Sequence, residues 1–81
     1  SNGDWTEEDD ITSPQIQFID TKCKQLNVNV IKFINQGDKK YEAIGDVRKM
    51  TASKMIKLLN EYQNKSKEIP DDIVGYNNNW R

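Results

Sequence analysis

The sequence predicts an all-α fold, a small three-helix domain over residues 11–68 with flexible ends. Two observations support this prediction. Thr12 and Thr51 are each preceded by an apolar residue and followed four positions later by another, which is the arrangement of a helix N-cap with a hydrophobic staple. After each threonine, apolar residues recur at the three- and four-residue spacing of an amphipathic helix.

The first helix is expected over residues 14–26. Gln15 stands three positions after Thr12 and completes a capping box, in which each of the two side chains bonds the other residue's backbone. Pro14 is tolerated because N–H groups in the first helical turn have no helical partners. The apolar stripe of this helix consists of Ile16, Ile19, Cys23 and Leu26.

A second, short helix is expected over residues 30–36, with Asn29 as its N-cap and Gly37 as the residue after its end. The alternation of polar and apolar residues over 26–30 also fits a β-strand. We favour the helix because a lone strand has no obvious partner in this chain.

The third helix is expected over residues 52–64. In the connector before it, Tyr41, Ile44 and Val47 stand three positions apart, so we expect one helical turn there and apolar anchors that reach the core. The stripe of the third helix consists of Met55, Leu58 or Leu59, and Tyr62.

The segments that flank the helices are polar. Residues 1–10 contain five acids and no base, which is typical of a solvated, disordered linker, and residues 1–3 resemble the remnant of a cleaved tag. We therefore expect an excised module of a longer protein. Pro70 ends any helix, so residues 69–81 form a tail that either folds back on the domain or stays mobile.

The composition excludes several classes of function. The chain has 81 residues, which is enough for one small domain, and 31% of them are charged. It lacks histidine, the commonest general base and metal ligand, so we expect no enzyme, no metal and no cofactor. Its single cysteine, Cys23, lies on an apolar stripe, which favours a buried, inert thiol and a reducing cytoplasm. No apolar run approaches the roughly 20 residues of a membrane span.

Basic residues provide the candidate binding site. Residues 11–69 contain eleven bases and six acids. The predicted partner- or DNA-binding residues surround the start of the third helix and the turn before it: Arg48, Lys49, Lys54, Lys57, Lys39 and Lys40. Clustered cations contact nucleic-acid phosphates or an acidic protein, whereas the alternative is an ordinary solvated face. The scarcity of arginine argues against the reading of base edges.

Two tryptophans are the other candidates. Trp5 and Trp80 stand in polar terminal segments, so each indole docks either on the domain or on a partner, where it would stack on unpaired bases. We interpret Tyr41 and Tyr62 as anchors of the core. Adjacent acids in the flexible ends lack the fixed geometry of a metal site.

The two helix starts carry a resemblance to a known family. The residues are Ile11-Thr12-x-x-Gln15-x-x-Phe18-Ile19-x-x-x-Cys23-x-x-Leu26-Asn27 and Met50-Thr51-Ala52-Ser53-Lys54-Met55-Ile56-x-Leu58-Leu59. Over about residues 11–63 the pattern resembles the C-terminal helical module of phage and prophage single-strand annealing recombinases of the Erf, Sak and RecT types. Met55 departs from it, since that position is commonly small.

The resemblance implies a non-catalytic accessory module. In such recombinases the N-terminal domain carries DNA annealing and oligomerisation, and the C-terminal domain recruits a single-strand-binding protein or an exonuclease. The alternatives are direct binding of single-stranded DNA by this domain, and a purely structural or oligomerisation cap. We expect oligomerisation to reside in another part of the longer chain.

Overall fold

The computed structural model describes residues 9–78 and 80, and its fold is the expected small all-α domain. No strand occurs among these residues, although two isolated β-bridges do. In chain order the elements are α1 (Ser13–Leu26), α2 (Val30–Ile34), the 3₁₀ turn η1 (Ile44–Asp46), α3 (Lys49–Gln63) and the 3₁₀ turn η2 (Asp71–Ile73).

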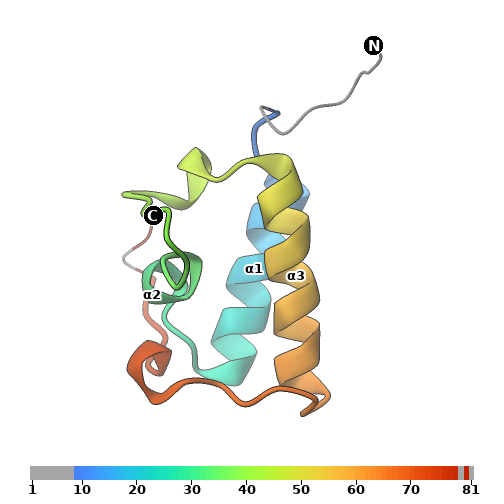
Figure 1. The fold of residues 1–81 in the computed structure, drawn as a ribbon, viewed down its shortest axis with the longest axis vertical. Coiled ribbons are helices and arrows are strands. Elements are labelled where there is room, and N and C mark those ends of the chain that lie inside the picture. The colour runs from blue at the N-terminus through green and yellow to red at the C-terminus, as the bar shows by residue number, and fades with distance from the viewer. Residues whose placement is uncertain (1–8, 79, 81) are drawn as a thin grey trace.

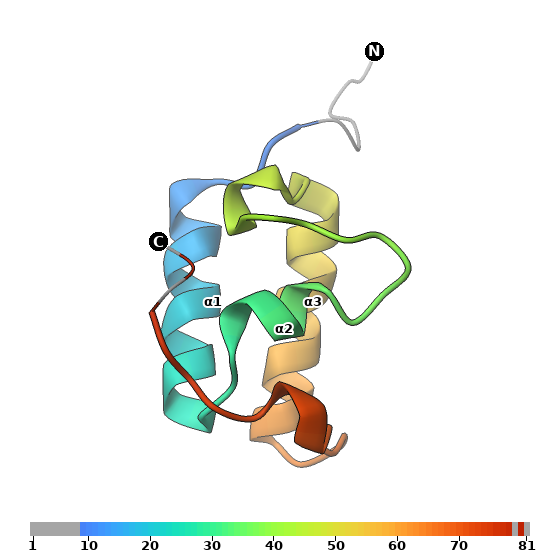
Figure 2. The ribbon, with the colours of Figure 1, turned by 90° about the vertical axis from the view of Figure 1, so that its left-hand side faces the viewer.

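The two long helices lie side by side and run in the same direction (Figure 1). Contacts at both ends show this pairing. The Gln15 side chain bonds the Lys49 carbonyl near the two helix starts, and Lys22 donates to the Gln63 side chain near the two helix ends. The short helix α2 crosses the face that α1 and α3 form together (Figure 2). The domain therefore has two layers, with the core between them.

The start of α1 is the predicted one. The Thr12 hydroxyl accepts a hydrogen bond from the Gln15 N–H at 3.3 Å, and Gln15 Oε1 accepts one from the Thr12 N–H at 3.0 Å. Asn27 ends the helix in the left-handed conformation, with φ of 56°. Asparagine tolerates this conformation better than most residues, which explains the break in the pattern at this point.

The predicted start of α3 is wrong by three residues. Thr51 is not its N-cap: the helix begins at Lys49, and the capping residue Arg48 makes no side-chain cap bond. The backbone before α1 replaces the side-chain cap. The Lys49 N–H donates to the Asp9 carbonyl at 2.7 Å, and Asp10 forms an antiparallel bridge with Arg48. Asp9 and Asp10 thus belong to the folded domain and not to the linker, which we had extended to residue 10.

The end of α2 also differs from the prediction. Asn29 caps the helix as expected, since its side chain accepts from the Lys32 N–H at 3.0 Å. The helix ends at Ile34, not at residue 36, and Gly37 is not the residue that terminates it. The Asn35 side chain instead bonds the backbone of Tyr41 in both directions, at 2.6 and 3.0 Å. These bonds turn the chain out of the helix.

The tail packs against the domain. Val74 forms an antiparallel bridge with Val28, so residues 26–30, which we also considered as a strand, find a partner in the tail. Gly75 donates its N–H to the Asn27 carbonyl at 2.8 Å and adopts φ of 115°, which favours glycine. Figure 2 shows the tail passing below α2 and then rising over α1, where the Tyr76 hydroxyl bonds Asp20.

The core draws on every element. The predicted stripe residues Ile19, Cys23 and Leu59 are fully buried. Others that we placed in the core are only partly buried against it: Ile16, Leu26, Met55 and Leu58. The connector anchors Tyr41, Ile44 and Val47 are buried as expected. The tail adds Ile73, and Ala52 lies fully buried where α3 needs a small residue.

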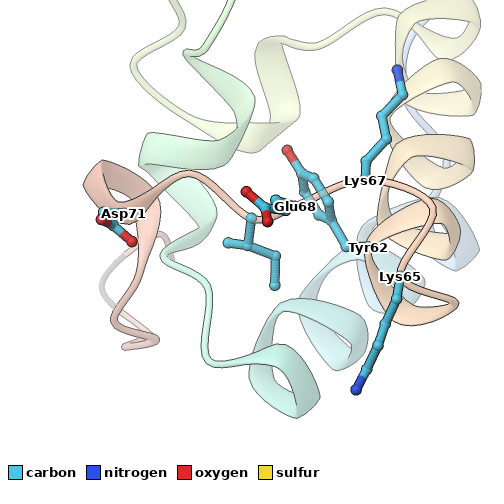
Figure 3. A pocket seen from close by; sticks show the side chains of 6 residues that line it. Tyr62, Lys65, Lys67, Glu68 and Asp71 are labelled. Atoms are coloured by element: carbon cyan, nitrogen blue, oxygen red, sulfur yellow. The ribbon is translucent and has the colours of Figure 1, made fainter.

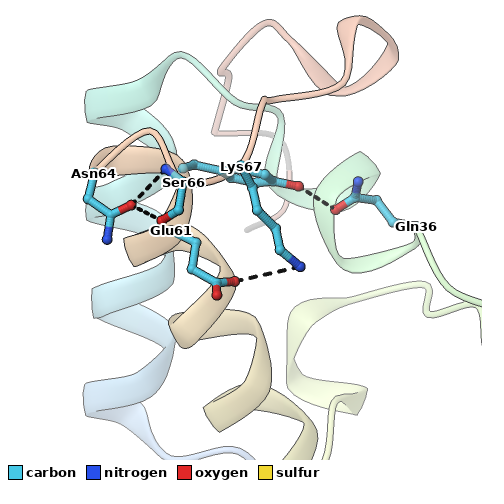
Figure 4. Close-up of polar contacts among 6 residues, drawn as sticks. Gln36, Glu61, Asn64, Ser66 and Lys67 are labelled. Carbon is cyan, nitrogen blue, oxygen red and sulfur yellow. Dashed lines mark hydrogen bonds and ion pairs between the residues drawn. The ribbon is translucent and has the colours of Figure 1, made fainter.

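Polar contacts hold the end of α3 (Figure 4). Asn64 accepts hydrogen bonds from the backbone N–H and the hydroxyl of Ser66. Lys67 lies 3.9 Å from the Glu61 carboxylate. The Tyr62 hydroxyl donates to Gln36 at 3.4 Å, so the end of α3 is tied to the segment that follows α2.

Candidate functional site

Three of the predicted basic residues lie exposed on α3. Lys49, Lys54 and Lys57 belong to the first part of the helix, and no hydrogen bond or ion pair of their ammonium groups occurs within the described residues. Lys54 and Lys57 are three positions apart, so they project from neighbouring positions of one helical face. This part of α3 therefore presents positive charge that the domain itself does not neutralise.

Arg48 has a different environment. Its guanidinium bonds the Asp10 carboxylate at 2.7 Å, and the two side chains are 45% and 77% exposed. The ion pair accompanies the backbone bridge that starts α3. An exposed pair of this kind contributes little to stability, about 0–1 kcal/mol. Arg48 thus has a structural contact that the three lysines lack.

Lys39 and Lys40 lie on the loop after α2. The Lys39 ammonium lies 5.6 Å from the centre of the Tyr41 ring. Lys40 donates to the carbonyls of Asn35 and Gly37 at 2.7 and 2.9 Å. Both side chains are exposed, and the Lys40 ammonium is held close to Gly37.

The two tryptophans have different outcomes. Trp5 lies outside the described residues. Trp80 is half-buried, and its indole N–H donates to the Asp20 carboxylate on α1 at 2.8 Å. The same carboxylate oxygen accepts from the Tyr76 hydroxyl at 2.6 Å. Trp80 therefore docks on the domain, one of the two arrangements that we considered.

A groove opens between α2 and α3, next to the exposed lysines. Its volume is about 190 Å³. We call it the α2–α3 groove; it is lined by Phe33, Ile34, Gln36, Gly37, Thr51, Lys54, Met55 and Leu58. Its lining is mostly apolar, and Lys54 is the one charged residue among the described residues that line it. Sequence reasoning missed this groove because Met55 and Leu58 looked like ordinary core positions.

A larger cavity of about 580 Å³ lies at the other end of α3, where the chain turns towards the tail (Figure 3). Its lining mixes two lysines with two acids, Lys65 and Lys67 with Glu68 and Asp71. Figure 3 shows the two lysine side chains extending in opposite directions. Their charges do not converge on one point, so the cavity lacks the arrangement of an anion site.

Cys23 is buried in the core as predicted. Burial, and secondarily the negative charge of Asp20, raises the pKa of its thiol from 9.0 to about 12. Since the thiolate is the reactive form, this environment keeps the sulfur unreactive near neutral pH.

Among the described residues there is neither a metal-binding cluster nor a helix that could cross a membrane. No group of three or more Cys, Asp or Glu side chains within residues 9–78 and 80 is arranged to hold a metal ion. None of the helices in this part of the chain is both long and apolar enough to span a bilayer. Comparison with protein-family models, curated proteins and solved structures finds no match.

Proposed function

We propose that this chain is the non-catalytic C-terminal interaction module of a phage-type single-strand annealing recombination protein. In this proposal the module works in the cytoplasm and recruits a partner, either a single-strand-binding protein or an exonuclease. The observation that carries the proposal is the exposed positive charge of Lys49, Lys54 and Lys57 on one helix beside an apolar groove.

Charge and shape support a protein partner. Exposed lysines attract an acidic partner and raise its association rate, while the apolar groove offers surface that is removed from water on binding. Direct binding of single-stranded DNA has less support, because the Trp80 indole N–H is bonded to Asp20 and the side chain is half-buried on the domain.

The test is a titration of the isotope-labelled 81-residue chain, followed by NMR chemical shifts. The ligands are the acidic tail peptide of a bacterial single-strand-binding protein, a phage exonuclease and a single-stranded oligonucleotide. We expect shifts over residues 48–58 with the peptide or the exonuclease. If neither the peptide nor the exonuclease shifts signals in that range at high concentration, the proposal is overturned. Shifts there with the oligonucleotide alone would replace it with DNA binding.

Charge-reversal variants supply the control. Combined substitution K49E, K54E and K57E should abolish binding, whereas K24E makes the same type of change at an exposed position of α1 and should leave binding intact. Circular dichroism of each variant checks that the helices persist. Equal affinity of the triple variant and the unsubstituted chain would contradict the assignment of α3 as the binding face.

A further inference from the structure

We infer that the α2–α3 groove takes an acidic peptide segment that carries one bulky apolar side chain. The inference rests on the proposed function and specifies the chemistry of the partner. The apolar side chain packs against the partly exposed Met55 and Leu58 of α3, and the acidic groups beside it face Lys54.

The size of the groove favours a single side chain. Pockets for small-molecule ligands have volumes of about 300–1,000 Å³. The groove, at about 190 Å³, is smaller than that range. Protein interfaces concentrate much of their binding energy in a few large side chains that fill pockets of this kind. The groove therefore has the dimensions of an anchor site in a protein interface.

The walls are ordered but still offer apolar surface. Phe33 and Ile34 form the α2 side and are each 2% exposed, so they belong to the rigid core. Phe33 packs edge-on against Tyr62 with ring centres 6.2 Å apart. Met55 and Leu58 on α3 are only partly buried and remain available for contact. A methionine in such a wall adapts its shape to the occupant.

Positive charge near the groove favours acidic residues beside the apolar anchor of the peptide. Lys54 lines the groove from α3, and the Lys40 ammonium, which lies outside the lining, bonds the carbonyl of the lining residue Gly37 at 2.9 Å. No acid is among the described residues that line the groove. Acidic groups beside the anchor are complementary to these cations.

Three short peptides with blocked ends separate the contribution of the apolar anchor to binding from that of the acidic residues. Their sequences are Asp-Asp-Phe-Asp-Asp, Asp-Asp-Ala-Asp-Asp and Asn-Asn-Phe-Asn-Asn. The first is titrated into the labelled 81-residue chain and should shift the signals of Phe33, Met55 and Leu58. We expect the alanine peptide to bind at least about tenfold more weakly, since it lacks the anchor. The uncharged peptide should also bind more weakly, and its affinity should not change with salt.

Two substitutions test the groove from the protein side. K54E reverses the charge at an exposed position of the groove lining and should weaken binding of the phenylalanine peptide at least about fivefold at low salt. Leu58→Gln makes one wall polar and should remove the advantage of phenylalanine over alanine. K24E is the matched control and should change neither the affinity of the phenylalanine peptide nor its advantage over the alanine peptide. Because K54E alters an exposed side chain, it remains informative if Leu58→Gln fails to fold.

The outcomes distinguish this inference from the proposed function. Equal binding of the phenylalanine and alanine peptides, or shifts confined to the cavity around Lys65 and Lys67, would overturn the groove assignment. So would a concentration-dependent dimer that protects Met55 and Leu58. If the peptides fail but a single-strand-binding protein or exonuclease still binds over residues 48–58, the groove assignment falls and the proposed function stands.

Discussion

The side chain of Gln15 reaches Ser53 across the two long helices, with its Nε2 donating to the Ser53 hydroxyl at 3.2 Å. The other end of the same amide accepts the Thr12 N–H at 3.0 Å. One side chain thus completes the cap of α1 and ties it to the first turns of α3. The cap of one helix is in this way part of the tertiary interface that sets the other helix in place.

Removal of the cap at Thr12 should destabilise the domain. T12A deletes the hydroxyl that accepts the Gln15 N–H at 3.3 Å. We expect a loss of about 1 kcal/mol in the free energy of unfolding, within the range of about 0.5–2 kcal/mol for N-caps. Urea denaturation followed by circular dichroism measures it. T12S keeps the oxygen and serves as the control, so equal midpoints for T12A and T12S would contradict the role of the cap.

The same substitution at Thr51 should have little effect. Thr51 stands inside α3, where the Lys49 N–H donates to the Asp9 carbonyl and the Ala52 N–H donates to the Arg48 carbonyl. T51A therefore removes no cap. Alanine also favours the helix over threonine by about 0.5 kcal/mol. We expect unchanged or slightly increased stability in the same urea experiment. A loss comparable to that of T12A would show that Thr51 caps the helix in solution.

Cys23 should make the domain less stable at alkaline pH. The pKa of its thiol is 9.0 ordinarily and about 12 in the folded chain. Between these values the unfolded chain loses the thiol proton while the folded chain keeps it. Stability from this group is therefore complete below pH 9 and decreases as the pH rises towards 12. Urea midpoints measured from pH 8 to pH 11 follow the decrease.

The comparison requires a variant without the thiol, which isolates the contribution of Cys23 to the change of stability with pH. C23A should have lower stability overall because of the cavity it leaves, but a shallower decline with pH. Reaction of the unsubstituted chain with a thiol reagent at pH 8 should be slow until urea is added. Rapid reaction of the folded chain would mean that the thiol is accessible.

The tail should depend on Asp20. D20A removes the acceptor of both Tyr76 and Trp80, and we expect a loss of about 1–3 kcal/mol, because hydrogen bonds to a charged group exceed neutral ones. In a W5F background Trp80 is the remaining tryptophan, so its fluorescence reports on the tail directly. We expect a red shift and stronger quenching by acrylamide in D20A.

Asp20→Asn retains an acceptor oxygen at the same place and should have an intermediate effect. Fluorescence of Trp80 that is identical in D20A and in the unsubstituted chain would show that the carboxylate does not hold the indole.

Local signals predicted the parts of this fold that local bonds control. The capping box of Thr12 and Gln15 and the cap at Asn29 involve residues only three positions apart. The error at Thr51 has the opposite origin. The residues around Thr51 do form the local pattern of a helix start. However, the Asp9 carbonyl accepts the Lys49 N–H, and the helix begins at Lys49. No short window of sequence contains both partners.

For the candidate site, the sequence alone determined which residues carry exposed charge, because lysines on the polar side of an amphipathic helix remain in water. Tertiary structure decided what those lysines stand beside. The groove exists only because α2 crosses α3 and leaves Met55 and Leu58 partly uncovered. Tertiary structure also decided that Trp80 docks on the domain, because its hydrogen-bond acceptor Asp20 lies 60 positions away in the chain. Contacts between distant segments depend on how helices pack, and helical periodicity does not encode that packing.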